Sequence, residues 1–276
     1  MITIQSLIDN KGSEHKALKS EHGLSVIVTS GRNKILFDTG SSDSFMYNAH
    51  LLNVDLSTLD CVVLSHNHYD HSLGFKMLKE SGNPVKRLYT GEHFFDIKYA
   101  KNGNVYTYLS CGWGADFIKR YGVDHITVVK KTEIADGIYA VGGFTTDKNN
   151  HYETIPERFV KNKNGVFVPD DFIDEVCLVI QKNDGLVMIV GCAHRGIVNM
   201  VSYVSALFNA PVNAVYGGVH LNEANEERCM FTLKALSSFG VKVAGFSHCS
   251  GDRVESMCNV YALESAHLSS GSIVFI

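Results

Sequence analysis

Short apolar segments recur along the whole chain, each rich in Val and Ile and bounded by Gly, Asn or Asp. This pattern predicts buried β-strands. The predicted strands cover residues 2–8, 24–30, 34–38, 59–65, 126–131, 138–144, 176–182, 186–192, 212–218, 242–248 and 272–276. Apolar residues at helical spacing predict helices over 196–209, 223–239 and 251–264. Paired strands followed by helices indicate an α/β fold, a four-layered αββα sandwich of two mixed β-sheets.

Two segments interrupt this pattern. Residues 92–122 carry many aromatic side chains among glycines, including Trp113, and residues 145–172 are polar. Long excursions on a compact scaffold often form lids or binding loops. We therefore expect a single domain over residues 1–276 with a lid or insert at about 92–172. A subsidiary core beneath a surface loop explains the aromatic residues equally well.

The composition narrows the class of protein. Of the 276 residues, 45% are apolar and 20% are charged, which is a globular profile. The net charge is 25 − 29 = −4 without a long basic run, so we expect no binding to nucleic acid. Seven Cys without a C-x-x-C pair suit a reducing compartment. Because no signal peptide and no apolar run of membrane-spanning length is evident, we expect a cytoplasmic protein with no membrane partner, and a homo-oligomer stays open.

The chain has 13 His, and three of them stand close together with an Asp. His66, His68, Asp70 and His71 directly follow the predicted strand 59–65. A turn that leaves a strand can direct His66 and His68 at one metal ion while Asp70 and His71 reach a second. Imidazole nitrogens and a carboxylate suit zinc, iron or manganese. The spacing therefore predicts a site for two divalent metal ions, with zinc as the default.

Three further histidines occupy equivalent places in the pattern. His194, His220 and His248 each follow the end of an apolar strand. A single His there is usually structural, but α/β architectures place ligands at the carboxyl ends of strands. Three of them downstream of the His66–His71 segment predict that they share its site.

The segment H-N-H-Y-D-H at 66–71, with F-D-T-G at 37–40, resembles the metallo-β-lactamase superfamily. The segments 191–197 and 247–251 resemble one branch of it, which includes the archaeal 7,8-dihydropterin-6-methyl-4-(β-D-ribofuranosyl)-aminobenzene-5′-phosphate synthase. The resemblance covers nearly the whole chain and implies the metallo-β-lactamase fold and a metal-dependent enzyme. It implies a supporting role near the metals for Asp38. It also implies a first metal held by His66, His68 and His194, and a second held by Asp70, His71 and His248.

This sequence departs from the superfamily at one position. Many superfamily hydrolases have an Asp that bridges both metals, between the third and the last His. No Asp lies between His194 and His248 here, and His220 stands at the expected place. We expect His220 to contact substrate or to be a weak ligand, which makes the second site the weaker one. Asp70 would orient a metal-activated water, and His220 would donate a hydrogen bond or a proton.

Candidate substrate contacts lie next to these ligands. Arg195 and the pair Ser250 and Gly251 stand where helices begin, and helix N-termini attract phosphate or carboxylate. Ordinary helix capping explains Ser250 as well. Trp113 is a candidate for stacking on a flat ring. Cys192 and Cys249 are expected to pack in the core, with Cys249 pointing away from His248 as strand alternation would place it.

Three functions fit these observations. The first is a hydrolase that uses two metals and an activated water on a small anionic, phosphate-bearing substrate. The alternative implied by the branch is a synthase that transfers a phosphoribosyl group. A non-catalytic metal-binding sensor or electron carrier is the third.

Overall fold

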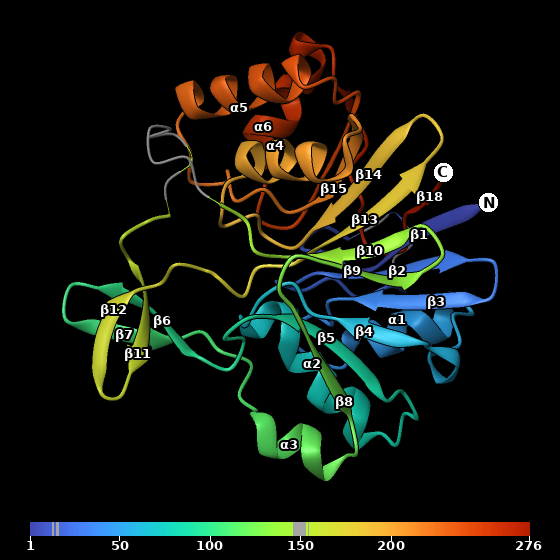
Figure 1. The fold of residues 1–276 in the computed structure, drawn as a ribbon, viewed down its shortest axis with the longest axis vertical. Helices are drawn as coiled ribbons and strands as arrows, with labels where there is room; N and C mark the ends of the chain where they lie inside the picture. Colours follow the sequence, from blue (N-terminus) through green and yellow to red (C-terminus); the bar gives the residue numbers. More distant parts are fainter. Residues whose placement is uncertain (13, 15–16, 146–152, 154) are drawn as a thin grey trace.

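The computed structural model describes residues 1–12, 14, 17–145, 153 and 155–276. Most strands form two seven-stranded sheets (Figure 1). The first has the order β18-β1-β2-β3-β4-β5-β8. Its strands are β1 Ile2–Ile8, β2 Ser25–Ser30, β3 Asn33–Phe37, β4 Cys61–Val63, β5 Arg87–Gly91, β8 Asp124–Val128 and β18 Ile273–Phe275. The second has the order β17-β16-β15-β14-β13-β10-β9. Its strands are β9 Lys131–Ala135, β10 Ile138–Val141, β13 Cys177–Lys182, β14 Gly185–Val190, β15 Val212–Gly217, β16 Val243–Phe246 and β17 Glu264–Ser265.

Both sheets are mixed. In the first, β1, β2 and β3 pair antiparallel, whereas β3, β4, β5 and β8 pair parallel. In the second, β9, β10, β13 and β14 pair antiparallel, and β14, β15, β16 and β17 pair parallel. The parallel halves need crossover segments, and the longer helices lie in these crossovers. The carboxyl ends of the parallel strands therefore carry the loops that enter helices.

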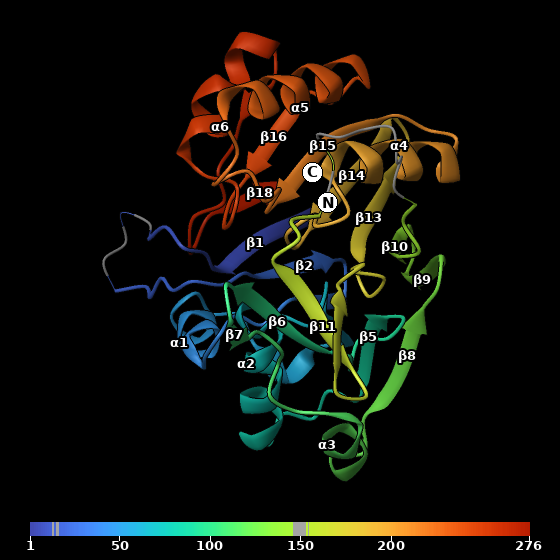
Figure 2. The same cartoon turned by 90° about the vertical axis from the view of Figure 1, so that its left-hand side faces the viewer.

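Helices cover the outer face of each sheet (Figures 1 and 2). The first sheet is covered by α1 Ser44–Leu51, α2 Tyr69–Glu80 and α3 Ala115–Arg120. The second is covered by α4 Ile197–Phe208, α5 Glu226–Ser238 and α6 Asp252–Met257. The helix expected over 251–264 is wrong in its second half. There α6 gives way to a 3-10 turn at Cys258–Tyr261, and Ala262 is left-handed at φ 58°.

Alternating strand residues fill three apolar layers, and these define the sandwich. Val26 and Val28 of β2 face Leu178 and Ile180 of β13 in the layer between the sheets, whereas Ile27 faces the helices. The layer outside the first sheet includes Phe45, Phe75 and Leu78 of its helices. The layer outside the second includes Val201, Leu233 and Leu236. The predicted four-layered αββα sandwich is confirmed.

A third sheet stands beside the sandwich, at the left of Figure 1. It has the order β12-β11-β6-β7. Its strands are β6 Ile97–Asn102, β7 Val105–Tyr108, β11 Phe159–Lys163 and β12 Val166–Pro169. Between β7 and β11 the chain returns to the sandwich as β8, β9 and β10, so residues 92–172 do not form one continuous insert. Among the described residues, no helix combines the length and the hydropathy that a membrane span requires.

Gly74 lets α2 pass close to the loop that follows β3. Its N–H donates to the carbonyl of Gly40 at 3.2 Å. A Cβ on Gly74 would lie 2.0 Å from the carbonyl oxygen of Thr39 and 2.9 Å from Phe45. Because backbone cannot yield as a flexible side chain does, a larger residue would push α2 off the sheet.

We predict that Gly74→Ala lowers the free energy of unfolding by about 1–3 kcal/mol, despite the better helix propensity of Ala. Gly114→Ala is the matched control, because a Cβ there has no described atom within 4 Å. It should cost about 0.5 kcal/mol or less. Urea unfolding followed by circular dichroism measures both, and equal unfolding midpoints for the two variants would contradict the close approach.

Candidate metal centre

Loops at the carboxyl ends of strands from both sheets meet at one place. His66 and His68 follow β4, His194 follows β14, His220 follows β15 and His248 follows β16. Tight turns present several of them, since His220 and His248 have φ values of 49° and 53°. Residues with side chains adopt this left-handed backbone at a cost and are often found at functional sites. The histidines that are far apart in sequence are therefore brought together, as their places in the pattern predict.

His66, His68 and His194 form the first group. Their ring centroids lie 4.5, 4.9 and 5.0 Å apart. Among the described residues, the Nε2 atoms of His66 and His68 and both ring nitrogens of His194 are buried without a hydrogen-bond partner. Burial, followed by neighbouring imidazoles, holds the pKa of His66 and of His194 well below its ordinary value, so both rings are neutral. Buried and unpartnered nitrogens on three neighbouring rings fit a bound metal ion.

Asp70, His71 and His248 form the second group. The Oδ2 atom of Asp70 lies 3.3 Å from Nε2 of His248 and 3.7 Å from Nε2 of His71. Burial alone would raise the pKa of the Asp70 carboxyl, but His71 and hydrogen bonds from His22 and His248 hold it well below its ordinary value. The group thus offers one carboxylate and two imidazoles. The two groups adjoin, because the His66 and His71 rings are 4.3 Å apart.

A cavity of about 250 Å³ adjoins both groups. It is lined by His22, His68, Tyr69, Asp70, Ala100, Leu109, Arg158, Phe159, Cys192, His194, His220, Asn222, Glu223, His248 and Cys249. His220 lies with its ring 4.6 Å from that of His194, and both of its ring nitrogens are unpartnered among the described residues. The structure therefore places the candidate ligands at a cavity of the size of a small molecule.

Comparison with known proteins places the chain in a family. Residues 20–157 match the metallo-beta-lactamase superfamily. The 7,8-dihydropterin-6-methyl-4-(beta-D-ribofuranosyl)-aminobenzene-5′-phosphate synthase of Methanocaldococcus jannaschii is 30% identical over 272 residues, which cover 93% of this chain and 90% of the relative. The chain belongs to the metallo-β-lactamase superfamily. It is an enzyme of this superfamily, which favours catalysis over the sensor or electron carrier.

Solved structures of the superfamily share the fold. Tm1679, described as a metal-dependent hydrolase of the β-lactamase superfamily, is 29% identical with a TM-score of 0.87, covering 100% of this chain and 99% of its own. Zn²⁺-bound PqqB from Methylobacterium extorquens is 12% identical with a TM-score of 0.59, covering 99% of this chain and 100% of its own. The second likeness shows the fold alone. Divalent metals are common in this superfamily, and the ligand groups described above fit them.

Asp38, the Asp of the F-D-T-G segment, supports the loops of the candidate metal centre. Its Oδ2 accepts a hydrogen bond from Nδ1 of His71 at 2.7 Å, and Oδ1 accepts one from the backbone N–H of Ser65 at 2.7 Å. The Ser65 hydroxyl donates to Oδ2 at 2.8 Å and lies 2.9 Å from Nδ1 of His66. This network turns the Nε2 atoms of both histidines toward the centre, as hydrogen bonds to metal-ligating histidines commonly do.

The N-terminal loop holds the last histidine, a contact that sequence reasoning missed. Asp9 accepts the backbone N–H of His248 at 2.7 Å, and Asn10 accepts from its Nδ1 at 2.8 Å. His22 of the same loop lies with Nε2 3.1 Å from Oδ2 of Asp70. No motif surrounds these polar residues in the sequence, so only the fold reveals their role.

A buried ion cluster supports the first group from the third sheet. Lys98 of β6 donates to Asp170 at 2.7 Å and to Asp174 at 2.8 Å. Asp174 also accepts the backbone N–H of Asn67, between His66 and His68, at 2.8 Å. Phe172 stacks on the ring of His194 with centroids 3.9 Å apart. The Nζ atom of Lys98 lies over the Phe172 ring, 4.1 Å from its centroid. The third sheet is therefore tied to the histidine loop by charge and by stacking.

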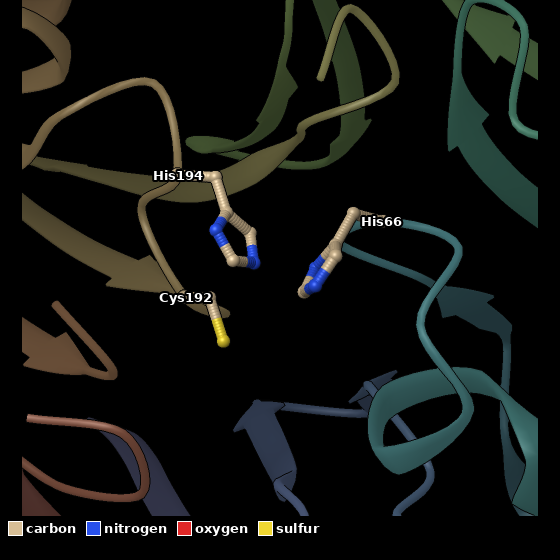
Figure 3. Close-up of side chains that lie close together, drawn as sticks. All are labelled: His66, Cys192 and His194. Atoms are coloured by element: carbon tan, nitrogen blue, oxygen red, sulfur yellow. The ribbon is translucent and has the colours of Figure 1, made fainter. Parts of the chain in front are cut away.

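Cys192 and Cys249 are buried as expected, but both also line the cavity, and Cys249 does not point away from the site. Cys192 Sγ lies 3.2 Å from Nε2 of His71 and 3.3 Å from Sγ of Cys249, and Figure 3 shows it beside His66 and His194. Strand alternation does not apply to Cys249, because β16 ends at Phe246 and the left-handed turn at His248 redirects the chain. Burial, followed by the interactions with Cys249, raises the pKa of the Cys192 thiol well above its ordinary value.

Arg195, Ser250 and Gly251, which were expected to contact substrate, do not line the cavity. The Arg195 guanidinium donates to the backbone carbonyls of Asp171 and Phe144. The Ser250 hydroxyl donates to the carbonyl of Ser247 at 2.7 Å, so it closes a turn. Gly251 is the N-cap of α6 at φ 86°. These residues build the loops around the site.

Trp113 also lies away from the cavity. Its indole Nε1 donates to the carbonyl of Ser72 at 3.0 Å, and its ring packs 5.2 Å from that of Phe75. It belongs to the apolar layer outside the first sheet. The cationic residue that does line the cavity is Arg158, which pairs with Glu223. Sequence reasoning missed it because neither residue stands in a motif.

His267 links the loop under His248 to α6. Its Nε2 lies 3.0 Å from Oδ2 of Asp9, and its Nδ1 lies 3.0 Å from Oε1 of Glu255. Burial alone would lower its pKa, but these carboxylates raise it from 6.5 to about 9. Because the pKa is higher in the folded state, the charged ring stabilises the fold below pH 6.5, and this contribution is lost as the pH rises through 9.

We predict that the wild type loses more stability between pH 6.5 and 9 than His267→Gln does, because Gln keeps a polar side chain but carries no charge. Urea unfolding at several pH values gives the slope for each protein. Parallel slopes would show that His267 does not titrate in this range in the folded state.

Proposed function

We propose that this enzyme is a hydrolase that uses a pair of divalent cations to cleave a small phosphate-bearing substrate. The observation that carries the proposal is the convergence of two adjoining ligand groups on one cavity. His66, His68 and His194 would hold one cation, and Asp70, His71 and His248 would hold the other. Zinc is the default for nitrogen-rich groups, with iron or manganese as alternatives. Two such cations, when bound, lower the pKa of water and polarise a substrate oxygen.

The side chains at the cavity have distinct tasks in this proposal. The carboxylate of Asp70 lies within hydrogen-bond distance of His22 and His248, which orient it. It can therefore accept a hydrogen bond from an attacking water and hold that water in position. His220 has unpartnered ring nitrogens and lines the cavity, which suits donation to negative charge that develops on the substrate or leaving group.

Arg158 is the anion-binding side chain in this proposal. Arg and Lys are otherwise absent from the described lining of the cavity. Its guanidinium lies 4.9 Å from the ring of Phe159 and pairs with Glu223, whose pKa that hydrogen bond lowers. A phosphate can replace the Glu223 carboxylate on the planar guanidinium, because both bind in the same two-pronged way.

A synthase is the second candidate, and the similarity to the Methanocaldococcus jannaschii enzyme favours it. The name of that enzyme gives a ribofuranosyl 5′-phosphate as part of its product, so a phosphate-bearing substrate is common to both candidates. The two reactions differ in what attacks the substrate, which is water in a hydrolase and an acceptor molecule in a transferase.

We predict that the zinc-, manganese- or iron-loaded protein turns over at least one member of a panel of phosphodiesters, phosphomonoesters and phosphoribosyl compounds. Asp70→Asn should lower kcat by about 10²-fold or more, because a proton acceptor is lost along with a ligand charge. Asp184→Asn, at an exposed turn before β14, is the matched control and should keep wild-type turnover. Wild-type turnover in Asp70→Asn would contradict the proposal.

Oxygen-18 from labelled water should enter the product, whereas a requirement for an aromatic amine acceptor would favour the synthase.

We also predict that Arg158→Gln raises KM for a phosphate-bearing substrate by about 10-fold or more and changes kcat less, because a charge-assisted pair contributes about 1.5–3 kcal/mol. Arg158→Lys should restore part of the loss as a point charge. Inhibition by inorganic phosphate measures the same contact without a substrate. An unchanged inhibition constant in Arg158→Gln would contradict this role for Arg158.

A further inference from the structure

One sulfur atom lies between the two ligand groups. Among the described residues, Cys192 Sγ, a ring nitrogen of His66 and one of His194 all lie within 4.8 Å of one another. The same sulfur lies within 4.8 Å of ring nitrogens of His71 and His248, which also lie within that distance of each other. Figure 3 shows the Cys192 side chain beside the His66 and His194 rings, with its sulfur below them in this view. Cys192 is therefore in reach of both cation positions.

The distances suit a ligand. Zinc–sulfur bonds of about 2.3 Å and zinc–nitrogen bonds of about 2.0 Å place neighbouring ligand atoms of a tetrahedral site about 3.5 Å apart. Cys192 Sγ is already 3.2 Å from Nε2 of His71. The remaining atoms are close enough for small rotations of side chains to complete the geometry.

The charge balance also favours a further anion among the ligands. Two divalent cations bring four positive charges to a buried place, and the six candidate ligands contribute only the carboxylate charge of Asp70. No Asp lies between His194 and His248 to supply a bridging carboxylate. His220 cannot replace it, because a neutral imidazole offers one lone pair to a metal. A thiolate carries a negative charge and has lone pairs for two cations.

We propose that Cys192 is a ligand shared by the two cations, in the place that a bridging carboxylate would otherwise occupy. The inference rests on the proposed pair of cations. On binding, the Cys192 thiol loses its proton to solvent as the metal–sulfur bonds form, with no change of oxidation state. Cys249, whose thiol donates to Cys192 Sγ at 3.3 Å, is a positioning residue. A thiolate in the site favours zinc or iron over manganese.

The test uses cobalt(II) as the probe on the full chain under a phosphine reductant. Cobalt bound to thiolate gives a sulfur-to-metal charge-transfer band in the near ultraviolet, which nitrogen and oxygen ligands do not give. We expect the band in the wild type and in Cys249→Ser, and its loss in Cys192→Ser. Zinc competition against a chromophoric chelator should show binding weakened by more than about 100-fold in Cys192→Ser, beyond the roughly 10- to 100-fold that loss of a supporting contact costs.

Cys192→Asp is the control for the possibility that Cys192→Ser loses the band because it fails to fold. It should bind two cobalt ions without the charge-transfer band, because the carboxylate restores the anion but not the sulfur. If the wild type binds two cobalt ions without the band, the proposed pair of cations is retained, but the proposal that Cys192 is a shared ligand is overturned. Loss of the band in Cys249→Ser but not in Cys192→Ser would overturn it as well. If the wild type binds no cobalt, zinc or manganese at all, the proposed function itself fails, and this inference fails with it.

Discussion

Buried imidazole nitrogens need a partner, and the histidines at the meeting point of the two sheets have too few. The ring nitrogens of His194 and His220 and the Nε2 atoms of His66 and His68 are unpartnered among the described residues. Leaving such groups buried and unsatisfied costs about 1–3 kcal/mol each, so a fold that collects several of them at one cavity must recover that cost elsewhere. In the proposed enzyme, metal ligation recovers it. The three apolar layers, the short loops and the left-handed turns all serve to hold these nitrogens together.

Buried charged contacts surround the site and orient its histidines. Asp38 fixes His71 and Ser65, Asp9 fixes the backbone of His248, and Lys98 joins two aspartates to the loop between His66 and His68. Each contact comes from a different part of the chain, so the rings are oriented by the fold as a whole. Because these partners are themselves buried and paired, the site is built before any cation or substrate arrives.

Much of this could be predicted from the sequence, and the failures have physical reasons. Apolar periodicity predicts the strands that have one or two buried faces. The spacing of His and Asp over residues 66–71 predicts the candidate ligands there. The third sheet was missed because its strands are partly exposed and polar, so their alternation is weak. Trp113, Arg195 and Ser250 were misplaced because a position next to a ligand in sequence says nothing about where a side chain points. Arg158, Glu223 and the inward turn of Cys249 depend on tertiary contacts and loop backbone, which no local pattern encodes.

In the proposed enzyme, six side chains hold two cations side by side next to the cavity. Crystals grown with zinc, with diffraction measured on both sides of the zinc absorption edge, test it most directly. We expect two anomalous peaks, one among His66, His68 and His194 and one among Asp70, His71 and His248. A single peak, or peaks away from these side chains, would contradict it.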